Sequence, residues 1–362
     1  MPRETSRCIV RGSTCRQHDN IHPGGANVRL GVIGLGRIGQ FHARALHAHP
    51  EVTSLVLADT NGDRALTFAA RLGATVSKTM DDLLGDVDAV VIASPTDTHA
   101  DLILQAVDRG VPAFCEKPVA LDLPSTRRVI ERVRARDAVV QIGFQRRFDA
   151  GYCAAREAVA SGALGRIYNM RIAGHDPSPP DESYLPGSGG IFRDLHIHDF
   201  DIIRWVLGQD VVEVYAQGAV LVDEMFARHD DVDTVAATLR MSGGTLGVLT
   251  GGRHNALGYD IRLELFGSKD SIAVGWDART PLRSVEPGMP PAPQNAWPFF
   301  LDRFDPAYRR ELATFIDVVA GRATNPCSVM DAEQSLLVAL ACERSYREHR
   351  PVTIAEIAAA AP

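Results

Sequence analysis

The sequence of 362 residues predicts two unlike domains: an α/β domain built on a parallel sheet, then an α+β domain with a large, mostly antiparallel sheet. The length fits two domains at roughly 150 residues each. In the first half, short apolar runs alternate with helix-length segments, which indicates βαβ units. In the second half, apolar residues alternate along longer segments at hairpin spacing, which is typical of antiparallel strands.

Composition excludes several classes of partner. Hydrophobic residues make up 45% and charged residues 23%, as in ordinary globular proteins. The net charge of −7 offers no positive field to a nucleic acid or an anionic membrane, so we expect neither as a partner. No apolar run reaches the ~18 residues of a membrane helix. The six cysteines are scattered without a CxxC pair, which favours reduced thiols and a cytoplasmic protein.

The first domain is expected over residues 28–148, after a polar, arginine-containing leader at 1–27. The leader lacks the apolar centre of a secretory signal; a transit peptide and an over-extended translation start both stay open for it. The predicted strands are 29–33, 53–58, 89–93, 113–115 and 139–143, and the predicted helices are 37–47, 62–71, 80–84, 100–108 and 124–136.

The second domain is expected over residues 149–328 and is assigned to substrate binding and oligomerisation. Its predicted helices are 151–161 and about 191–207, and its predicted strands are 166–173, 211–222, 233–240, 244–251, 260–267 and 270–275. The proline-rich stretch 277–299 is expected to be a surface excursion. Closing helices at about 304–320 and 329–348 are expected to pack on the first domain, with 329–354 forming a C-terminal helix and strand there.

A glycine-rich turn follows the first strand and opens a helix: Gly34-Leu35-Gly36-Arg37-Ile38-Gly39. The three glycines allow a tight turn, a close approach to a pyrophosphate and close helix packing, so the stretch predicts a Rossmann dinucleotide site rather than a purely structural turn. Asp59 ends the second strand, where it can accept the ribose hydroxyls and repel a 2′-phosphate. This favours NAD over NADP, although the nearby Arg64 can accommodate that phosphate.

Two further strand ends lead to the same crevice, because parallel sheets bind ligands at the carboxyl ends of their strands. Ser94, Thr96 and His99 follow one strand, and Glu116-Lys117 end the next. We expect all five to contact the cofactor. A helix cap is the alternative for the first group, and a surface salt bridge for the second.

The densest polar cluster lies in the predicted helix near 191–207. Asp194, His198, Asp201 and Trp205 fall on one stripe of an otherwise apolar helix, so Asp194 is expected to orient the His198 imidazole. A histidine capped within the core is the alternative. His196 and His198 point to opposite sides of a helix, and we therefore expect no metal site.

Taken together, these motifs resemble the Gfo/Idh/MocA oxidoreductases, and most closely their inositol 2-dehydrogenase branch. The resemblance covers residues 28 to about 354. It rests on the glycine turn, Glu116-Lys117-Pro118, Gly143-Phe144-Gln145-Arg146-Arg147-Phe148-Asp149, the 189–205 helix and Gly258-Tyr259-Asp260.

The resemblance implies that Lys117, Asp194 and His198 are catalytic, and that Arg147 and Tyr259 contact substrate. A hydride passes between NAD and a secondary alcohol of a cyclic polyol or sugar, such as myo-inositol. His198 serves as base and Lys117 steadies the alkoxide. Asp176 is a further candidate for binding the polyol, together with Asp194 and His198. A homodimer or homotetramer formed through the large sheet is also implied.

Three alternatives stay open. A sugar or anhydrosugar reductase would run the same chemistry in reverse. An NAD-dependent glycosidase would oxidise a sugar only transiently. A regulator that binds the cofactor without catalysis is disfavoured, because it has no need of Lys117, Asp194 and His198 together.

Overall fold

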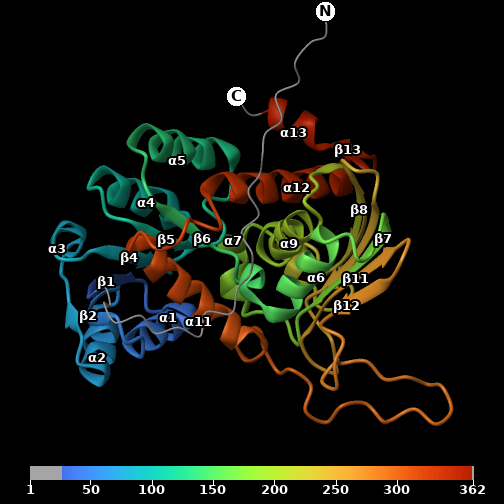
Figure 1. Cartoon of the computed structure of the whole chain (residues 1–362), viewed down its shortest axis with the longest axis horizontal. Helices are drawn as coiled ribbons and strands as arrows, with labels where there is room; N and C mark the ends of the chain where they lie inside the picture. The colour runs from blue at the N-terminus through green and yellow to red at the C-terminus, as the bar shows by residue number, and fades with distance from the viewer. Residues whose placement is uncertain (1–26, 361–362) are drawn as a thin grey trace, which may run out of the picture.

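The computed structural model describes residues 27–360, so the leader expected at 1–27 lies outside it save for Asn27. Figure 1 shows the two domains side by side, with a helical layer between their sheets. Within the described residues, no helix is both long and apolar enough to cross a membrane.

The first domain has a six-stranded parallel sheet in the order β3-β2-β1-β4-β5-β6. Its strands are β1 (Val28–Ile33), β2 (Val52–Ala58), β3 (Thr75–Val76), β4 (Ala89–Ile92), β5 (Ala113–Glu116) and β6 (Val140–Gly143). Its helices are α1 (Arg37–His47), α2 (Gly62–Leu72), α3 (Met80–Gly85), α4 (His99–Asp108) and α5 (Leu123–Arg136), with a 3₁₀ turn η1 (Thr96–Thr98). The predicted α/β domain is confirmed; the short β3 was not predicted. The strand order reverses between β1 and β4, which is where such sheets bind ligands.

The second domain has a seven-stranded sheet in the order β12-β11-β7-β10-β9-β8-β13. Its strands are β7 (Ile167–His175), β8 (Val211–Ala219), β9 (Thr234–Met241), β10 (Leu246–Gly252), β11 (Asp260–Gly267), β12 (Ser271–Val274) and β13 (Val352–Thr353). The predicted, mostly antiparallel sheet is confirmed, with one exception that matters for the site: β7 and β10 run parallel.

Helices cover one face of this second sheet, between it and the first domain (Figure 1). The helices in this part of the chain are α6 (Ala150–Ala160), α7 (Leu185–Ser188), α8 (Ile191–Asp194), α9 (Ile197–Leu207) and α10 (Met225–Arg228), with 3₁₀ turns η2 (Gln145–Phe148) and η3 (Glu182–Tyr184). Ile261, Leu263 and Leu265 of β11 are buried in the core beneath these helices, whereas Arg262 and Glu264 are only half-buried. The alternation along β11 therefore follows the two faces of the sheet.

The closing segments depart in part from expectation. Helix α11 (Phe300–Val319) does pack on the first domain, where Phe315 and Ile316 join its core. Helix α12 (Val329–Glu348) has only its first turn in that core, and its later residues pack in the core of the second domain. Strand β13 pairs with β8 and leads into α13 (Ile354–Ala360), so 329–354 does not pack on the first domain alone. The 277–299 stretch has no helix or strand and projects from the body, as predicted (Figure 1).

Candidate active site

The glycine turn at the end of β1 has the form that a pyrophosphate requires. Gly34 adopts φ +87°, and a Cβ there would lie 2.6 Å from the Ser94 Cα. A Cβ on Gly39 would lie 1.9 Å from the Gly34 oxygen. Gly36, in contrast, has no other atom within 4 Å of its Cβ position, and it begins α1 without a capping side chain. The open space in front of these free N–H groups fits a dinucleotide phosphate.

Asp59 is held firmly beside this turn. Its carboxylate accepts hydrogen bonds from the Leu35 N–H at 2.7 Å and from Arg64 at 3.0 and 2.6 Å. Burial raises the pKa of Asp59, but these hydrogen bonds together with one from the Asn61 N–H outweigh burial and lower it. A hollow of about 290 Å³ next to it is lined by Asn61, Arg64 and Arg71, among others. The Asp59 carboxylate, which is expected to accept the ribose hydroxyls, is therefore already paired with Arg64.

The other predicted cofactor residues differ in exposure and in the residues that they contact. Ser94 is half-buried and bonds Thr98 at 2.6 Å, and Thr96 is half-buried in η1. Arg37 is exposed and stacks on Phe299, 4.9 Å from the ring centre. Ile38 packs partly into the core of the second domain.

His99 and Glu116, two further predicted cofactor contacts, each have hydrogen-bond partners within the first domain. The ring nitrogens of His99 lie 2.7 Å from the Pro118 oxygen and 2.9 Å from the Ser94 oxygen, so this buried side chain ties two loops together. Glu116 meets the buried His42 of α1 at 2.7 Å. The sequence placed both residues at strand ends, but it could not show which way their side chains turn.

Lys117 and Asp194 meet where the two domains join. The Lys117 ammonium donates to the Asp194 backbone oxygen at 2.8 Å and lies 3.4 Å from the carboxylate. Their side chains are 16% and 11% exposed, so the pair is sheltered but accessible. Asp194 also accepts a hydrogen bond from the Tyr184 hydroxyl at 2.8 Å and pairs with Arg253 at 2.9 Å. Although burial raises it, the charges of Lys117 and Arg253 bring the pKa of Asp194 down to about 2.

His198 lies close to Lys117 but is held differently from the prediction. Its Nδ1 is buried without a hydrogen-bond partner, and its ring packs edge-on against Phe144. Burial, followed by the positive charge of Lys117, keeps its pKa well below 6.5, so the imidazole is neutral. Across residues 27–360, no hydrogen bond joins Asp194 to His198, because the helix breaks between α8 and α9 and the predicted common stripe does not form.

Asp176 faces the same charged cluster from the end of β7. It lies 3.2 Å from Arg253, and burial raises its pKa despite that cation. Asp231 approaches from the loop before β9 and accepts the Ile191 N–H at 3.0 Å, and burial likewise raises its pKa.

The sequence analysis missed Arg253, Tyr184 and Asp231 as parts of this cluster. Arg253 follows the end of β10 as Asp176 follows the end of β7, and the parallel register pairs Gly252 with His175. A charged residue directly after a predicted strand could therefore have indicated Arg253. The sequence predicts antiparallel hairpins, in which the carboxyl ends of these two strands would lie far apart.

Arg147 and Tyr259 are not placed like open substrate contacts. Arg147 forms a bidentate ion pair with Asp201 at 2.8 and 2.5 Å, and it also donates to the Pro326 oxygen and approaches Asp331 at 3.2 Å. Its side chain is 4% exposed, so Arg147 joins η2 to α9 and α12. Tyr259 is buried at the start of β11 with its ring edge-on to Phe304.

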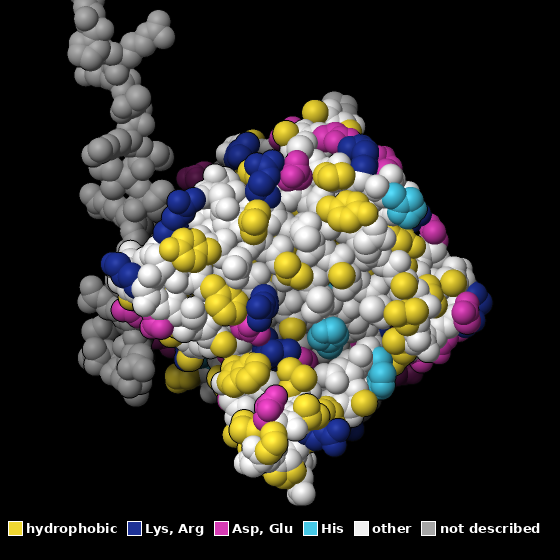
Figure 2. All heavy atoms as spheres, turned by 90° about the vertical axis from the view of Figure 1, so that its right-hand side faces the viewer, with side chains coloured by type: hydrophobic (Ala, Val, Ile, Leu, Met, Phe, Trp, Pro, Cys, Tyr) yellow, Lys and Arg dark blue, Asp and Glu magenta, His cyan; other side chains and the backbone are white. Residues whose placement is uncertain are grey.

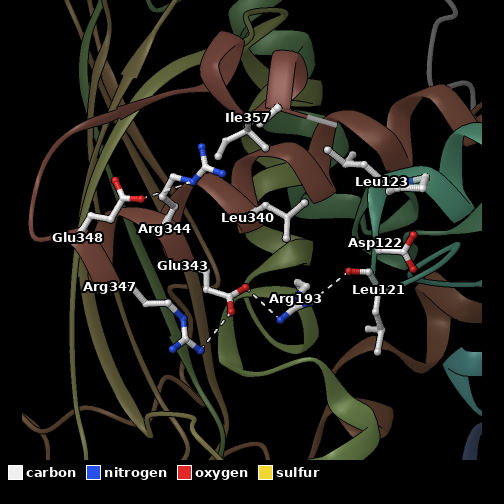
Figure 3. A pocket seen from close by; sticks show the side chains of 12 residues that line it. Leu121, Asp122, Leu123, Arg193, Leu340, Glu343, Arg344, Arg347, Glu348 and Ile357 are labelled. Atoms are coloured by element: carbon white, nitrogen blue, oxygen red, sulfur yellow. Dashed lines mark hydrogen bonds and ion pairs between the residues drawn. The ribbon is translucent and has the colours of Figure 1, made fainter. Parts of the chain in front are cut away.

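A second hollow, of about 420 Å³, lies behind α8 between α5, α12 and α13. Figure 3 shows Arg193 reaching across it, from the Leu121 oxygen at 3.1 Å to Glu343 at 3.0 Å. Leu121 follows the Lys117 loop, and Arg193 precedes Asp194. Arg193 therefore links the segment after Lys117 to the segment that holds Asp194.

Among residues 27–360, no three His, Cys, Asp or Glu side chains are grouped so that they could hold a metal ion.

Both domains of this chain match known protein families. Residues 28–144 match the family described as "Oxidoreductase family, NAD-binding Rossmann fold", and residues 152–273 match the "GFO/IDH/MocA C-terminal domain". Myo-inositol 2-dehydrogenase of Thermotoga maritima is 38% identical over 91% of this chain and 99% of its own. Inositol 2-dehydrogenase of Rhizobium meliloti is 37% identical over 91% of this chain and 99% of its own. A solved scyllo-inositol dehydrogenase of Lactobacillus casei with bound NAD(H) and scyllo-inositol superposes with a TM-score of 0.83 at 26% identity, covering 91% of this chain and 99% of that chain.

Proposed function

Because this chain belongs to the Gfo/Idh/MocA oxidoreductase family, we propose that it oxidises a ring hydroxyl of an inositol to the ketone. It is an NAD-dependent dehydrogenase that acts on CH–OH groups of polyols. The choice of reacting groups rests on the Lys117–Asp194 pair, which is largely buried but still accessible and lies beside a neutral His198.

The cofactor is held by the first domain. Gly34, Gly36 and Gly39 would receive the pyrophosphate at the start of α1, and Asp59 would meet the adenosine ribose. Arg37, Ile38, Ser94, Thr96, His99, Glu116 and Lys117 would be further contacts of the cofactor. When bound, NAD supplies the acceptor for the hydride.

The residues of this chain manage the proton. The neutral imidazole of His198 has one ring nitrogen free to accept the hydroxyl proton of the substrate, because its lowered pKa leaves the ring uncharged near neutral pH. The Lys117 ammonium donates a hydrogen bond to the same oxygen and stabilises negative charge as it develops there. Asp194 holds Lys117 by its backbone oxygen and its carboxylate.

A polyol also needs groups that recognise the hydroxyls that do not react. Asp176 is 18% exposed beside Asp194, so its carboxylate can accept hydrogen bonds from hydroxyls of the substrate. Tyr259 is a further candidate on the family resemblance alone, because its side chain is buried.

The test is a panel of inositols, aldoses and their keto forms with NAD and with NADP, following both NADH and product. The proposal expects one keto-inositol for each NADH. Faster reduction of a keto sugar would favour the reductase alternative, and release of a free sugar without net NADH would favour the glycosidase.

We further propose a homodimer or homotetramer that acts in the cytoplasm. Figure 2 shows the outer face of the second sheet, and the helices of residues 27–360 lie on its other side (Figure 1). Leu246 and Val248 of β10 are 58% and 48% exposed there, and a second copy of the sheet would bury them. Cys115, Cys327 and Cys342 are buried and form no disulfide, which suits a reducing compartment. Residues 28–148 and 149–328 serve as the cofactor and substrate domains in this proposal.

A further inference from the structure

Arg253 is the most deeply buried charge in the cluster around Asp194. Its side chain is 3% exposed, whereas those of Lys117, Asp194 and Asp176 are 16%, 11% and 18% exposed. Arg253 therefore lies behind the two carboxylates and does not share their access to the crevice.

The guanidinium of Arg253 joins two strands to the catalytic segment. One terminal nitrogen lies 3.2 Å from Asp176, and the other lies 2.9 Å from the Asp194 oxygen that Lys117 does not approach. The Arg253 N–H donates to the Asp233 oxygen at 2.8 Å, and the Asp176 N–H donates to the Gly252 oxygen at 2.9 Å. The backbone on both sides of the bridge is thus fixed.

Without Arg253, the carboxylate of Asp194 would keep only Lys117 and the Tyr184 hydroxyl as partners. Two other acids, Asp176 and Asp231, stand close enough to oppose its charge, and the nearby His198 is neutral. Burial alone favours the protonated acid, and a neutral acid holds an ammonium ion poorly.

We propose that Arg253 is a positioning residue of the dehydrogenase reaction: by bridging Asp176 and Asp194 it keeps the Asp194 carboxylate charged and oriented for Lys117. This inference rests on the proposed function for its effect on turnover. The effect on Asp194 itself can be measured without any substrate.

The first test compares Arg253→Gln, Arg253→Lys and the control Arg127→Gln in inositol oxidation over a range of pH. Arg127 is a partly buried arginine that pairs with Glu333 and the Ala358 oxygen, far from the reacting groups. In Arg253→Gln, kcat should fall about 100-fold, because a misplaced group of this kind costs that much. The acid limb of the kcat profile should move to higher pH while NAD binding is retained. Arg253→Lys should recover part of kcat, and Arg127→Gln should keep the wild-type profile.

The second test follows the ¹³C carboxyl signal of Asp194, assigned with Asp194→Asn, in wild type and in both Arg253 variants. Removing the cation should raise the pH at which Asp194 titrates. An unchanged titration, or a loss of kcat with the acid limb unmoved, would overturn the role. If Arg253→Gln does not fold, the same two readouts on Arg253→Met, which also removes the cation, decide. If wild type oxidises no inositol, the proposed function fails, but the titration still tests Arg253.

Discussion

Two arginine–aspartate clusters border the same stretch of chain, and they differ in what they leave open. At the end of α8, Asp194 is shared among Lys117, Arg253 and Tyr184, and part of it reaches the crevice. On α9, Asp201 is paired twice with Arg147, and both side chains are at most 4% exposed. Both clusters are buried and charged. The two clusters therefore differ in exposure and not in charge. The Asp194 cluster is accessible to a substrate, whereas the Asp201 cluster is closed and joins the two domains.

The break between α8 and α9 creates this difference. Gly189 and Gly190 have φ of +81° and +84°, which bring the chain into α8 at an angle, and α8 ends at Asp194 before α9 begins at Ile197. A continuous helix would have placed Asp194 and Asp201 on one face. In the structure, Asp194 turns to the first domain's Lys117, while Asp201 turns to η2.

The largest difference should appear on removing the lysine. Lys117→Ala should lower kcat about 10³-fold, since the developing alkoxide loses its charged partner. Thermal unfolding and NAD binding by calorimetry serve as controls and should stay near wild type. A loss of only a few-fold would mean that Lys117 is not a catalytic residue.

Arg147→Met should lower the stability of the protein and leave its kcat nearly unchanged. It leaves Asp201 buried without its partner, which costs about 3–5 kcal/mol of the free energy of unfolding. Urea denaturation measures this loss, and the kcat of the molecules that remain folded should stay close to wild type. If kcat falls with little change in stability, Arg147 contacts substrate after all.

His198 should show a smaller effect and a distinctive titration. His198→Gln is expected to lower kcat about 100-fold through loss of the base. In the protein without ligands, the His198 ring signals in NMR should titrate well below pH 6.5, because burial and Lys117 disfavour the charged ring. The His198 ring is neutral at pH values above its lowered pKa and positively charged only below that pKa. In Lys117→Ala the titration should move up, and an ordinary value near 6.5 in wild type would contradict this environment.

Asp59→Ser should have the smallest effect of the four. Its loss removes hydrogen bonds from a charged group to the ribose, so the KM for NAD should rise about tenfold. It also frees Arg64, so the KM for NADP should fall. Steady-state kinetics with both cofactors decide the point. A ratio of the two kcat/KM values equal to that of wild type would remove Asp59 as the source of preference for NAD.

Local features were predictable from the sequence, and long-range ones were not. The turn from Gly34 to Gly39 and the position of Asp59 follow from a strand, a turn and a helix that are adjacent in the chain. The partnership of Asp176 with Arg253 depends on two strands, 77 residues apart, running parallel. The hydrogen bonds of His99 to the Pro118 oxygen and of Glu116 to His42 were not predictable either, because they join residues 19 and 74 positions apart in the chain.

The most direct test of the account follows the hydride itself. Wild-type enzyme is given myo-inositol carrying deuterium on its ring carbons together with NAD, and the reduced cofactor is examined by mass spectrometry. We predict one deuterium in each NADH formed, one keto-inositol for each NADH, and a rate near zero in Lys117→Ala. Turnover that leaves no deuterium in the cofactor would contradict direct hydride transfer at this site.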